Sequence, residues 1–274
     1  MNPGSKQALS RQLASHRGQY GIDGGGRALA GLLWPAGGGL LLLGLSLLPM
    51  SPKPLLQRAL EFLAGAALLQ VPASFFYSTI RGKFAVWAEL LAGLDLRGNE
   101  RILEIGCGRG AILAMLGKLL PEGRAVGLDL WRTEDQSGNS LESARTNLVS
   151  EGVADRCELH TGDMRALPFP DASFDLVVSN LAIHNIPEKD SRREAIDEAI
   201  RVLKPGGRIL IADLFRTEEY VQRLEEAGLR AVSCRPLGWR FWFGVLGVTP
   251  RLVTAEKPAS GTSPPETTPP DLPP

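Results

Sequence analysis

The sequence predicts an α/β protein whose mainly parallel sheet is flanked by helices and is preceded by one or two transmembrane helices. Strand-like and helix-like segments alternate between residues 101 and 228, as they do when crossover helices connect parallel strands. Two candidate strands, 176–178 and 209–211, are continuously apolar, which is typical of strands that are buried on both faces. Two long stretches without charged residues come before this pattern.

The first of these stretches predicts a membrane span. Residues 1–27 are polar and glycine-rich, so we expect a flexible segment without a packed core there. No charged side chain occurs from residue 28 to 51, and a helix of that length would measure about 36 Å, enough to cross a hydrocarbon core of about 30 Å. Pro35 and the glycines at 37–39 would weaken a helix in water but are tolerated in membrane helices. We therefore expect a first span over about 28–50.

A second uncharged stretch, residues 62–80, predicts a second span. It is less uniform, because four residues dilute its apolar character: Gln70, Pro72, Ser74 and Tyr77. Basic residues flank both stretches, and the positive-inside bias favours a hairpin over 28–80 with both ends in the cytoplasm. Two alternatives stay open. The first stretch could be a cleaved signal peptide, or both could form an apolar cap that packs on the soluble domain or lies in the membrane interface.

The soluble α/β domain is expected over residues 84–256. Apolar residues at helical spacing predict an amphipathic helix over 84–94, and a short apolar run predicts the first strand at 102–105. The elements predicted next are helix 111–120, strand 124–129, helix 139–151, strand 156–161, strand 174–179, helix 190–203, strand 207–213 and helix 217–228. The last two strands, 231–235 and 251–256, have no helix between them and should pair antiparallel.

The amino-acid composition limits the classes of partner that the chain is expected to bind. Thirty basic and thirty acidic residues balance each other, so we expect no nucleic-acid partner held by bulk charge. The three cysteines lie far apart and lack metal-ligand spacing, so we expect no metal site and reduced thiols in a domain that faces the cytosol. Residues 257–274 are rich in Pro, Ser and Thr and predict a disordered tail. No feature identifies a protein partner.

An aromatic run, Trp239-Arg-Phe-Trp-Phe243, lies between the last two strands. It could pack in the core between these strands. It could also lie at the level of lipid headgroups, where tryptophan and basic residues anchor membrane proteins. The sequence leaves both interpretations open.

A glycine loop, Gly106-Cys-Gly-Arg-Gly110, follows the first strand and leads directly into a helix. Gly106, Gly108 and Gly110 let the backbone adopt positive φ and let a ligand approach closely, and the free N–H groups of the helix start attract electron-rich groups. This arrangement is typical of nucleotide sites. The spacing also fits the dinucleotide fingerprint loosely, so the loop alone does not identify the nucleotide.

Three acidic residues near this loop restrict the kind of nucleotide that it can bind. Glu104, at the end of the first strand, suits a ligand with an ammonium group and would repel a pyrophosphate. Asp129 ends the second strand, where a carboxylate can accept hydrogen bonds from both ribose hydroxyls. Asp163 follows the third strand and could bind an adenine amine, with Met164 packed on the ring. Together they predict a cationic nucleoside without phosphate, such as S-adenosylmethionine.

With these motifs the sequence resembles the class I S-adenosylmethionine-dependent methyltransferases, in particular the small-molecule and lipid branch (methyltransferase type 11) that includes the ubiquinone and menaquinone methyltransferases. The resemblance covers residues 84–256. The matching motifs are Ile102-Leu-Glu-Ile-Gly-Cys-Gly-Arg-Gly110, Gly127-Leu-Asp129, Gly162-Asp-Met164 with Leu167-Pro-Phe169, Phe174-Asp-Leu-Val-Val-Ser179, and Arg201-Val-Leu-Lys-Pro-Gly-Gly-Arg208. It implies a Rossmann-like seven-stranded sheet of six parallel strands and one antiparallel strand, with S-adenosylmethionine as the cofactor.

The resemblance also implies which residues contact the cofactor: Glu104, Gly106, Cys107, Gly108, Gly110, Asp129, Leu130, Gly162, Asp163, Met164 and Asn180. The backbone carbonyl of Asn180 would contact the methionine moiety. The segment 179–185 lies next to the methyl group in this family, so His184 could deprotonate an acceptor hydroxyl or thiol. His184 could instead cap the next helix or hydrogen-bond the loop. No catalytic base is required when the acceptor atom is already nucleophilic, because methyl transfer then needs mainly alignment and desolvation.

One segment departs from the family pattern. Residues 131–138 intervene where the family runs almost directly from the second strand into a helix. Trp131 could cover the adenine, and Glu134 or Asp135 could line the acceptor opening. A solvated surface loop is an equal alternative.

The sequence therefore predicts a membrane-tethered methyltransferase whose catalytic domain faces the cytoplasm. The acceptor is expected to be small, and membrane tethering is the reason to expect a lipophilic one. Two alternatives remain. One is a non-catalytic membrane scaffold that binds S-adenosylmethionine or its product. The other is an NAD(P)-dependent oxidoreductase, which is disfavoured because the chain lacks a Tyr-x-x-x-Lys pair and Glu104 would repel a pyrophosphate.

Overall fold

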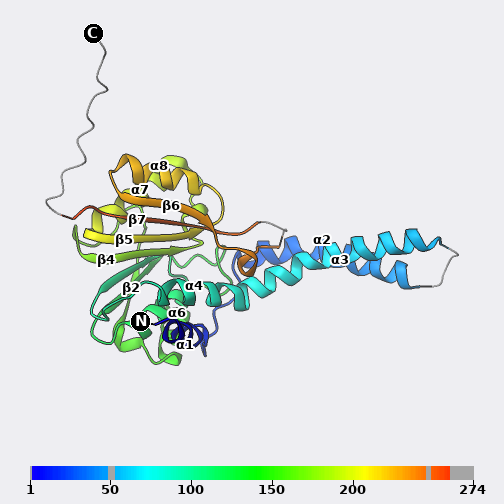
Figure 1. Cartoon of the computed structure of the whole chain (residues 1–274), viewed down its shortest axis with the longest axis horizontal. Helices are drawn as coiled ribbons and strands as arrows, with labels where there is room; N and C mark the ends of the chain where they lie inside the picture. The colour runs from blue at the N-terminus through cyan, green and yellow to red at the C-terminus, as the bar shows by residue number, and fades with distance from the viewer. Residues whose placement is uncertain (1, 49–52, 245–247, 260–274) are drawn as a thin grey trace, which may run out of the picture.

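The computed structural model describes residues 2–48, 53–244 and 248–259, and within these residues seven strands form one sheet (Figure 1). The strands are β1 (Arg101–Ile105), β2 (Arg124–Asp129), β3 (Cys157–Thr161), β4 (Phe174–Asn180), β5 (Leu203–Asp213), β6 (Arg230–Pro236) and β7 (Arg251–Glu256). Their order is β3-β2-β1-β4-β5-β7-β6, and β7 is antiparallel to both of its neighbours. The expected sheet of six parallel strands and one antiparallel strand is confirmed.

Helices cover both faces of this sheet (Figure 1). On one face lie α4 (Lys83–Ala92), α5 (Ala111–Leu119) and α6 (Leu141–Ser150), and on the other lie α7 (Lys189–Val202) and α8 (Thr217–Glu226). Short 3₁₀-helical turns lie between these elements: η2 (Ala154–Arg156), η3 (Ile183–Asn185) and η4 (Trp239–Phe241). Element boundaries agree with the expected ones to within a few residues. The largest difference is the start of β5, which begins at Leu203 rather than at 207 because Leu203 pairs with Phe174 across an irregular register.

The N-terminal segment is ordered, which corrects the expectation of a flexible stretch over residues 1–27. Helix α1 (Pro3–Ala14) begins at Asn2, whose side chain accepts a hydrogen bond from the N–H of Ser5 at 2.8 Å. Its Leu13 is fully buried in the core cluster that also contains Phe84 of α4. The few apolar residues of this segment are too sparse to predict packing, and the face of α4 supplies the partner that they lack.

Helices α2 (Gly25–Leu47) and α3 (Leu55–Tyr77) lie side by side and project from the α/β domain (Figure 1). They approach each other closely at two glycines, since a Cβ atom on Gly65 would lie 2.9 Å from the carbonyl oxygen of Gly39. Many outward leucines are exposed. Both helices are long and apolar enough to cross a membrane, by length and composition. Residues 49–52, at the end of the first expected span and in the turn, lie outside the described residues.

The hairpin is continuous with the α/β domain. Helix α3 runs through a π-helical turn, η1 (Ser78–Gly82), directly into α4. The disordered tail was expected over residues 257–274, and its residues 260–274 lie outside the described residues. Lys257, the first residue of that stretch, still pairs with the sheet, because its N–H donates to the carbonyl of Gly207 at 2.9 Å.

Candidate functional site

A cavity of about 390 Å³ lies where the carboxyl ends of β1, β2 and β4 meet. Ligands of open parallel sheets bind at this edge, where the strand order reverses between β1 and β4. The loops after these strands form most of the wall, and Asp23, Ala28 of α2 and Phe75 of α3 complete it. Among the described residues, the cavity is lined by His184 and by every expected cofactor contact except Gly110, the N-cap of α5, whereas Trp131 and Glu134 are not among its lining residues.

The glycine loop has the conformation that its sequence predicts. Gly106, Gly108 and Gly110 have φ angles of 72°, 50° and 78°, a region that residues with a Cβ atom rarely adopt. The loop is also crowded from outside. A Cβ atom on Gly106 would lie 2.2 Å from the Cβ of Ala182, and one on Gly108 would lie 2.4 Å from Oε1 of Gln136.

Asp129 holds this loop in place. Its Oδ2 accepts a hydrogen bond from the N–H of Gly108 at 2.8 Å, and its Oδ1 accepts one from the N–H of Trp131 at 2.6 Å. The side-chain amide of Asn139 donates to Oδ1 at 3.2 Å. An ionised carboxylate offers about four acceptor positions, so these bonds leave room for a ligand hydroxyl. Contact with a ribose stays a prediction.

Glu104 is the most unusual charge in the cavity. It is 2% exposed, and its Oε2 has no hydrogen-bond partner among the residues that the structure describes. Burial, together with the nearby charge of Asp129, raises the pKa of Glu104 well above its ordinary value. A buried carboxylate oxygen without a hydrogen-bond partner is costly, and a cationic ligand would relieve that cost. The site therefore fits the ammonium-bearing end of S-adenosylmethionine.

His184 is held by a buried carboxylate that the sequence did not reveal. Its ring Nδ1 is hydrogen-bonded to Oδ1 of Asp213, and its backbone N–H donates to Oδ2 of Asp213 at 3.0 Å. The hydroxyl of Tyr220 donates to Oδ2 at 3.1 Å. Burial lowers the pKa of His184, but the hydrogen bond and charge of Asp213 outweigh it and raise that pKa above the ordinary value. This pairing leaves Nε2 as the nitrogen that can take a proton.

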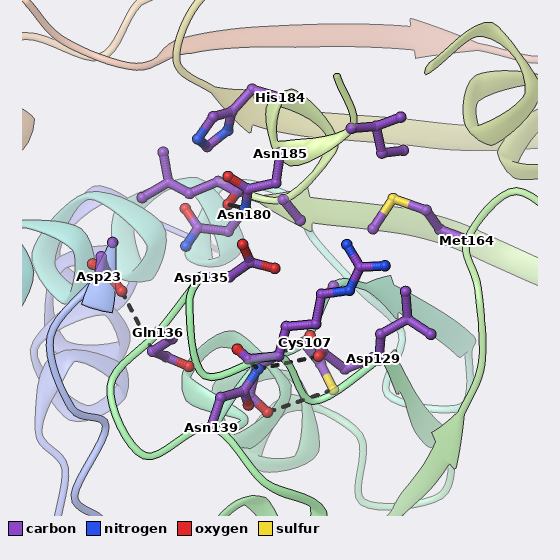
Figure 2. A pocket seen from close by; sticks show the side chains of 18 of the residues that line it. Asp23, Cys107, Asp129, Asp135, Gln136, Asn139, Met164, Asn180, His184 and Asn185 are labelled. Carbon is purple, nitrogen blue, oxygen red and sulfur yellow. Dashed lines mark hydrogen bonds between the residues drawn. The ribbon is translucent and has the colours of Figure 1, made fainter. Parts of the chain in front are cut away.

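The loop after β2 contributes to the cavity from the opposite side. In Figure 2, His184 and Asn185 lie on one side of the cavity, and Asp129 and Asn139 lie across from them. Asp135 lines the cavity, whereas its neighbour Glu134 is not among the described lining residues. Burial and the charge of Asp129 raise the pKa of Asp135. Of the two acids expected near the acceptor opening, Asp135 is the one in position.

Other expected contacts are already engaged within the chain. The carboxylate of Asp163 forms a bidentate pair with Arg165, with contacts from 2.6 to 3.0 Å, which lowers the pKa of Asp163. The side-chain oxygen of Asn180 accepts a hydrogen bond from the Trp87 indole at 2.7 Å. The indole of Trp131 donates to the hydroxyl of Thr161 at 2.7 Å. An adenine amine at Asp163 would have to share the carboxylate with Arg165.

The strap, residues 16–24 between α1 and α2, closes one side of the site and was missed from sequence. Asp23 accepts hydrogen bonds from Nζ of Lys83 at 2.8 and 3.0 Å and from the hydroxyl of Thr79 at 2.7 Å. The strap also pairs with the loop after β2, because the N–H of Gly24 donates to the carbonyl of Asp135 at 2.8 Å. A usable signal was present, since Asp23 is the single acidic residue among the first 27.

Comparisons with known proteins agree with this geometry. Residues 103–211 match the family model described as a methyltransferase domain. The chain is 34% identical over 149 residues to the ubiquinone/menaquinone biosynthesis C-methyltransferase UbiE of Pseudomonas putida (strain GB-1), covering 53% of this chain and 55% of that protein. It is 32% identical over 132 residues to the demethylmenaquinone methyltransferase of Lactiplantibacillus plantarum, covering 48% of this chain and 52% of that protein.

A solved structure supports the same fold. The crystal structure of the [4+2]-cyclase SpnF aligns with a TM-score of 0.53 at 19% identity, over 65% of this chain and 83% of that one, and at this identity the likeness concerns the fold alone. The chain spans about half the length of the curated relatives it matches. Residues 103–211 therefore match a methyltransferase domain, and the seven-stranded sheet around them has the corresponding fold. This domain is of the S-adenosylmethionine-dependent kind that the motifs indicated.

Proposed function

We propose that this chain transfers a methyl group from S-adenosylmethionine to a small lipophilic acceptor at a membrane surface. The observation that carries the proposal is the buried Glu104 carboxylate, whose Oε2 has no partner among the described residues and lies beside a glycine loop. A carboxylate in that position favours a cationic ligand and disfavours a pyrophosphate. The matched methyltransferase domain contains this loop.

The cofactor residues would divide the ligand among them. Glu104 would bind its ammonium group, and Asp129 would accept hydrogen bonds from the ribose while keeping Gly108 and Trp131 in place. Asp163 and Met164 would bind the adenine, and the carbonyl of Asn180 would contact the methionine moiety. When bound, the cofactor supplies an electrophilic methyl group on a sulfonium. The chain's part is to align the acceptor with that group and to exclude water.

His184 would act as general base toward the acceptor. Asp213 fixes the ring through Nδ1, so Nε2 can accept a proton from a hydroxyl or thiol at or next to the methylated atom. The raised pKa of His184 makes its neutral imidazole a stronger base, and that neutral form is present above the raised pKa. A general base of this kind suits an acceptor that must lose a proton, such as a phenol or enol.

Two features support a lipophilic acceptor in a membrane. Ala28 and Phe75, from the two hairpin helices, line the cavity together with Phe243. The hairpin itself would span the bilayer, with its small-residue contact at Gly39 and Gly65 typical of helix packing in lipid. The flanking basic residues favour a catalytic domain in the cytoplasm. The two relatives named above bear quinone methyltransferase names, which agrees with an acceptor of this class.

The test is a methyl-transfer assay with the full chain in lipid vesicles. S-adenosylmethionine labelled on the methyl group is added with a lipid extract of the host, and label in the organic phase is measured together with S-adenosylhomocysteine. We expect both products from the native chain and from Glu122→Gln, an exposed control, and neither from Glu104→Gln. Binding of S-adenosylmethionine without either product would favour the scaffold alternative. Label confined to water-soluble products would contradict the lipophilic acceptor.

A further inference from the structure

The aromatic loop, residues 239–244 between β6 and β7, extends away from the sheet and packs along helix α3. The carbonyl of Gly244 accepts hydrogen bonds from the hydroxyl of Ser74 at 3.1 Å and from the amide of Gln70 at 3.3 Å. At the base of the hairpin, a Cβ atom on Gly82 would lie 1.7 Å from the carbonyl oxygen of Arg240, so the two backbones touch. The aromatic loop is thus docked on the hairpin from residue 82 to residue 70.

The side chains of this loop divide between the core and the surface. Phe241 is fully buried, which agrees with the core interpretation of the aromatic run. Trp239 is 63% exposed and stacks on the exposed ring of Tyr77, with centroids 5.9 Å apart and planes 15° apart. Phe243 packs edge-on against Phe75, and both line the cavity. The loop therefore connects an exposed aromatic pair to the wall of the site.

The hydrogen bonds to Gly244 explain two polar residues in an otherwise apolar helix. Uncharged residues extend to Ile80 and the charge of Arg81 follows, so the membrane surface would lie near this point. Ser74 lies about 9 Å and Gln70 about 15 Å further along the helix at 1.5 Å per residue. Non-helical backbone at that depth must have its polar groups satisfied by protein. Ser74 and Gln70 do this for the Gly244 carbonyl, and the N–H of Phe243 donates to the carbonyl of Val248 at 2.9 Å.

We propose that the aromatic loop is a third lipid-contacting element, which enters a phospholipid bilayer beside α3. Trp239 and Tyr77 lie at headgroup level, where amphipathic rings concentrate, and Arg81 lies close to phosphate groups, whereas Arg240 is paired with Glu89 at 2.5 Å. Phe243 lies deeper and makes the acyl-chain side of the cavity wall. The catalytic domain thus rests on the membrane with the apolar wall of its site at the lipid boundary. This inference rests on the proposed membrane hairpin.

A bilayer accounts for this surface better than a second copy of the chain does. A protein partner would need a continuous complementary face, whereas the exposed groups here are a stacked tryptophan and tyrosine close to Arg81, a composition usual at a membrane interface. At a protein interface that water can reach, water would satisfy the carbonyl of Gly244, and hydrogen bonds from Ser74 and Gln70 would not be needed.

The experiment measures tryptophan quenching by lipids of known bromine position. The full chain is placed in phosphatidylcholine vesicles, either unmodified or brominated near the top of the acyl chain. Native protein is compared with Trp239→Phe, with Trp34→Phe in α2 and with Trp131→Phe in the catalytic domain. Trp87, whose indole donates to Asn180, and Trp242, the second tryptophan of the aromatic loop, are kept in every variant, so each difference reports the substituted residue alone. Phenylalanine at 239 keeps a ring against Tyr77, so the fold should persist.

We expect brominated lipid to quench the emission of Trp239 and Trp34 but not that of Trp131. Trp239→Phe and Trp34→Phe should each remove part of the quenched fraction, and Trp131→Phe should remove none. If Trp34→Phe reduces quenching and Trp239→Phe does not, the loop proposal is overturned while the hairpin stands. If neither does, the membrane hairpin itself fails. Shielding of Trp239 together with a cross-linked dimer would assign the loop to a second copy and also overturn the proposal.

Discussion

The ion pair between Asp23 and Lys83 ties the strap to the catalytic domain, and removing one partner should destabilise the fold strongly. Their side chains are 13% and 1% exposed, and both carboxylate oxygens contact Nζ of Lys83. Asp23→Asn would leave the ammonium group buried without its ion-pair partner. Loss of one partner of a buried pair costs about 3–5 kcal/mol, whereas an exposed pair contributes about 0–1 kcal/mol.

The assay is thermal unfolding in detergent micelles, with Lys6→Gln as the matched control. Lys6 pairs with Asp95 at 2.7 Å on the surface, where the side chains are 33% and 55% exposed. We expect Asp23→Asn to lower Tm by on the order of 10 °C and Lys6→Gln by about 3 °C at most. Adding Lys83→Met to Asp23→Asn should recover part of the loss, because it removes the uncompensated charge. Equal shifts for the two single variants would refute the reasoning.

Three further predictions concern the base, the hairpin and the cofactor carboxylate. Asp213→Asn should lower kcat by about 10²-fold and move the rising limb of the pH–rate profile to lower pH, because the neutral base forms only above the pKa of His184 and Asp213 raises that pKa in the native chain. An unmoved limb would exclude His184 as the base. Gly65→Ala should weaken the contact between the hairpin helices, seen as a lower Tm or less cross-linking between them, whereas Gly44→Ala, whose Cβ meets none of the described atoms within 4 Å, should be neutral; equal effects would contradict the close packing. Because the pKa of Glu104 is raised, binding of a cation should release a proton, so affinity should rise with pH and the heat should depend on the buffer; buffer-independent heat would show that Glu104 is not the partner.

Local sequence features predicted most of the fold and much of the site. Apolar runs such as 176–178 and 209–211 could be placed because strands buried on both faces need no partner-specific information. Glu104, Asp129 and Asp163 could be placed for a similar reason, since each lies at or just after the end of a strand and the strand ends of a parallel sheet converge at one edge. The cavity at that edge contains all three.

The missed features depend on contacts between distant parts of the chain. Lys83 lies sixty residues from Asp23 in the sequence, and neither residue has a spacing that signals the other. Asp213 ends β5 and reaches His184 only because β4 and β5 are adjacent, so the pair could be recognised once the strand order was known. The packing of α1 depends likewise on the face of α4. In contrast, the pairing of Asp163 with Arg165 is local, and it could have been anticipated.

The central claim is that the cavity binds S-adenosylmethionine through its carboxylates, and calorimetric titration tests it most directly. We predict saturable binding of S-adenosylmethionine by the full chain in micelles and no binding of NADH. Glu104→Gln should weaken the affinity by about tenfold or more, equivalent to about 1.4 kcal/mol, while Glu122→Gln should leave it unchanged. The absence of heat with S-adenosylmethionine, or equal affinity in the two variants, would contradict the account.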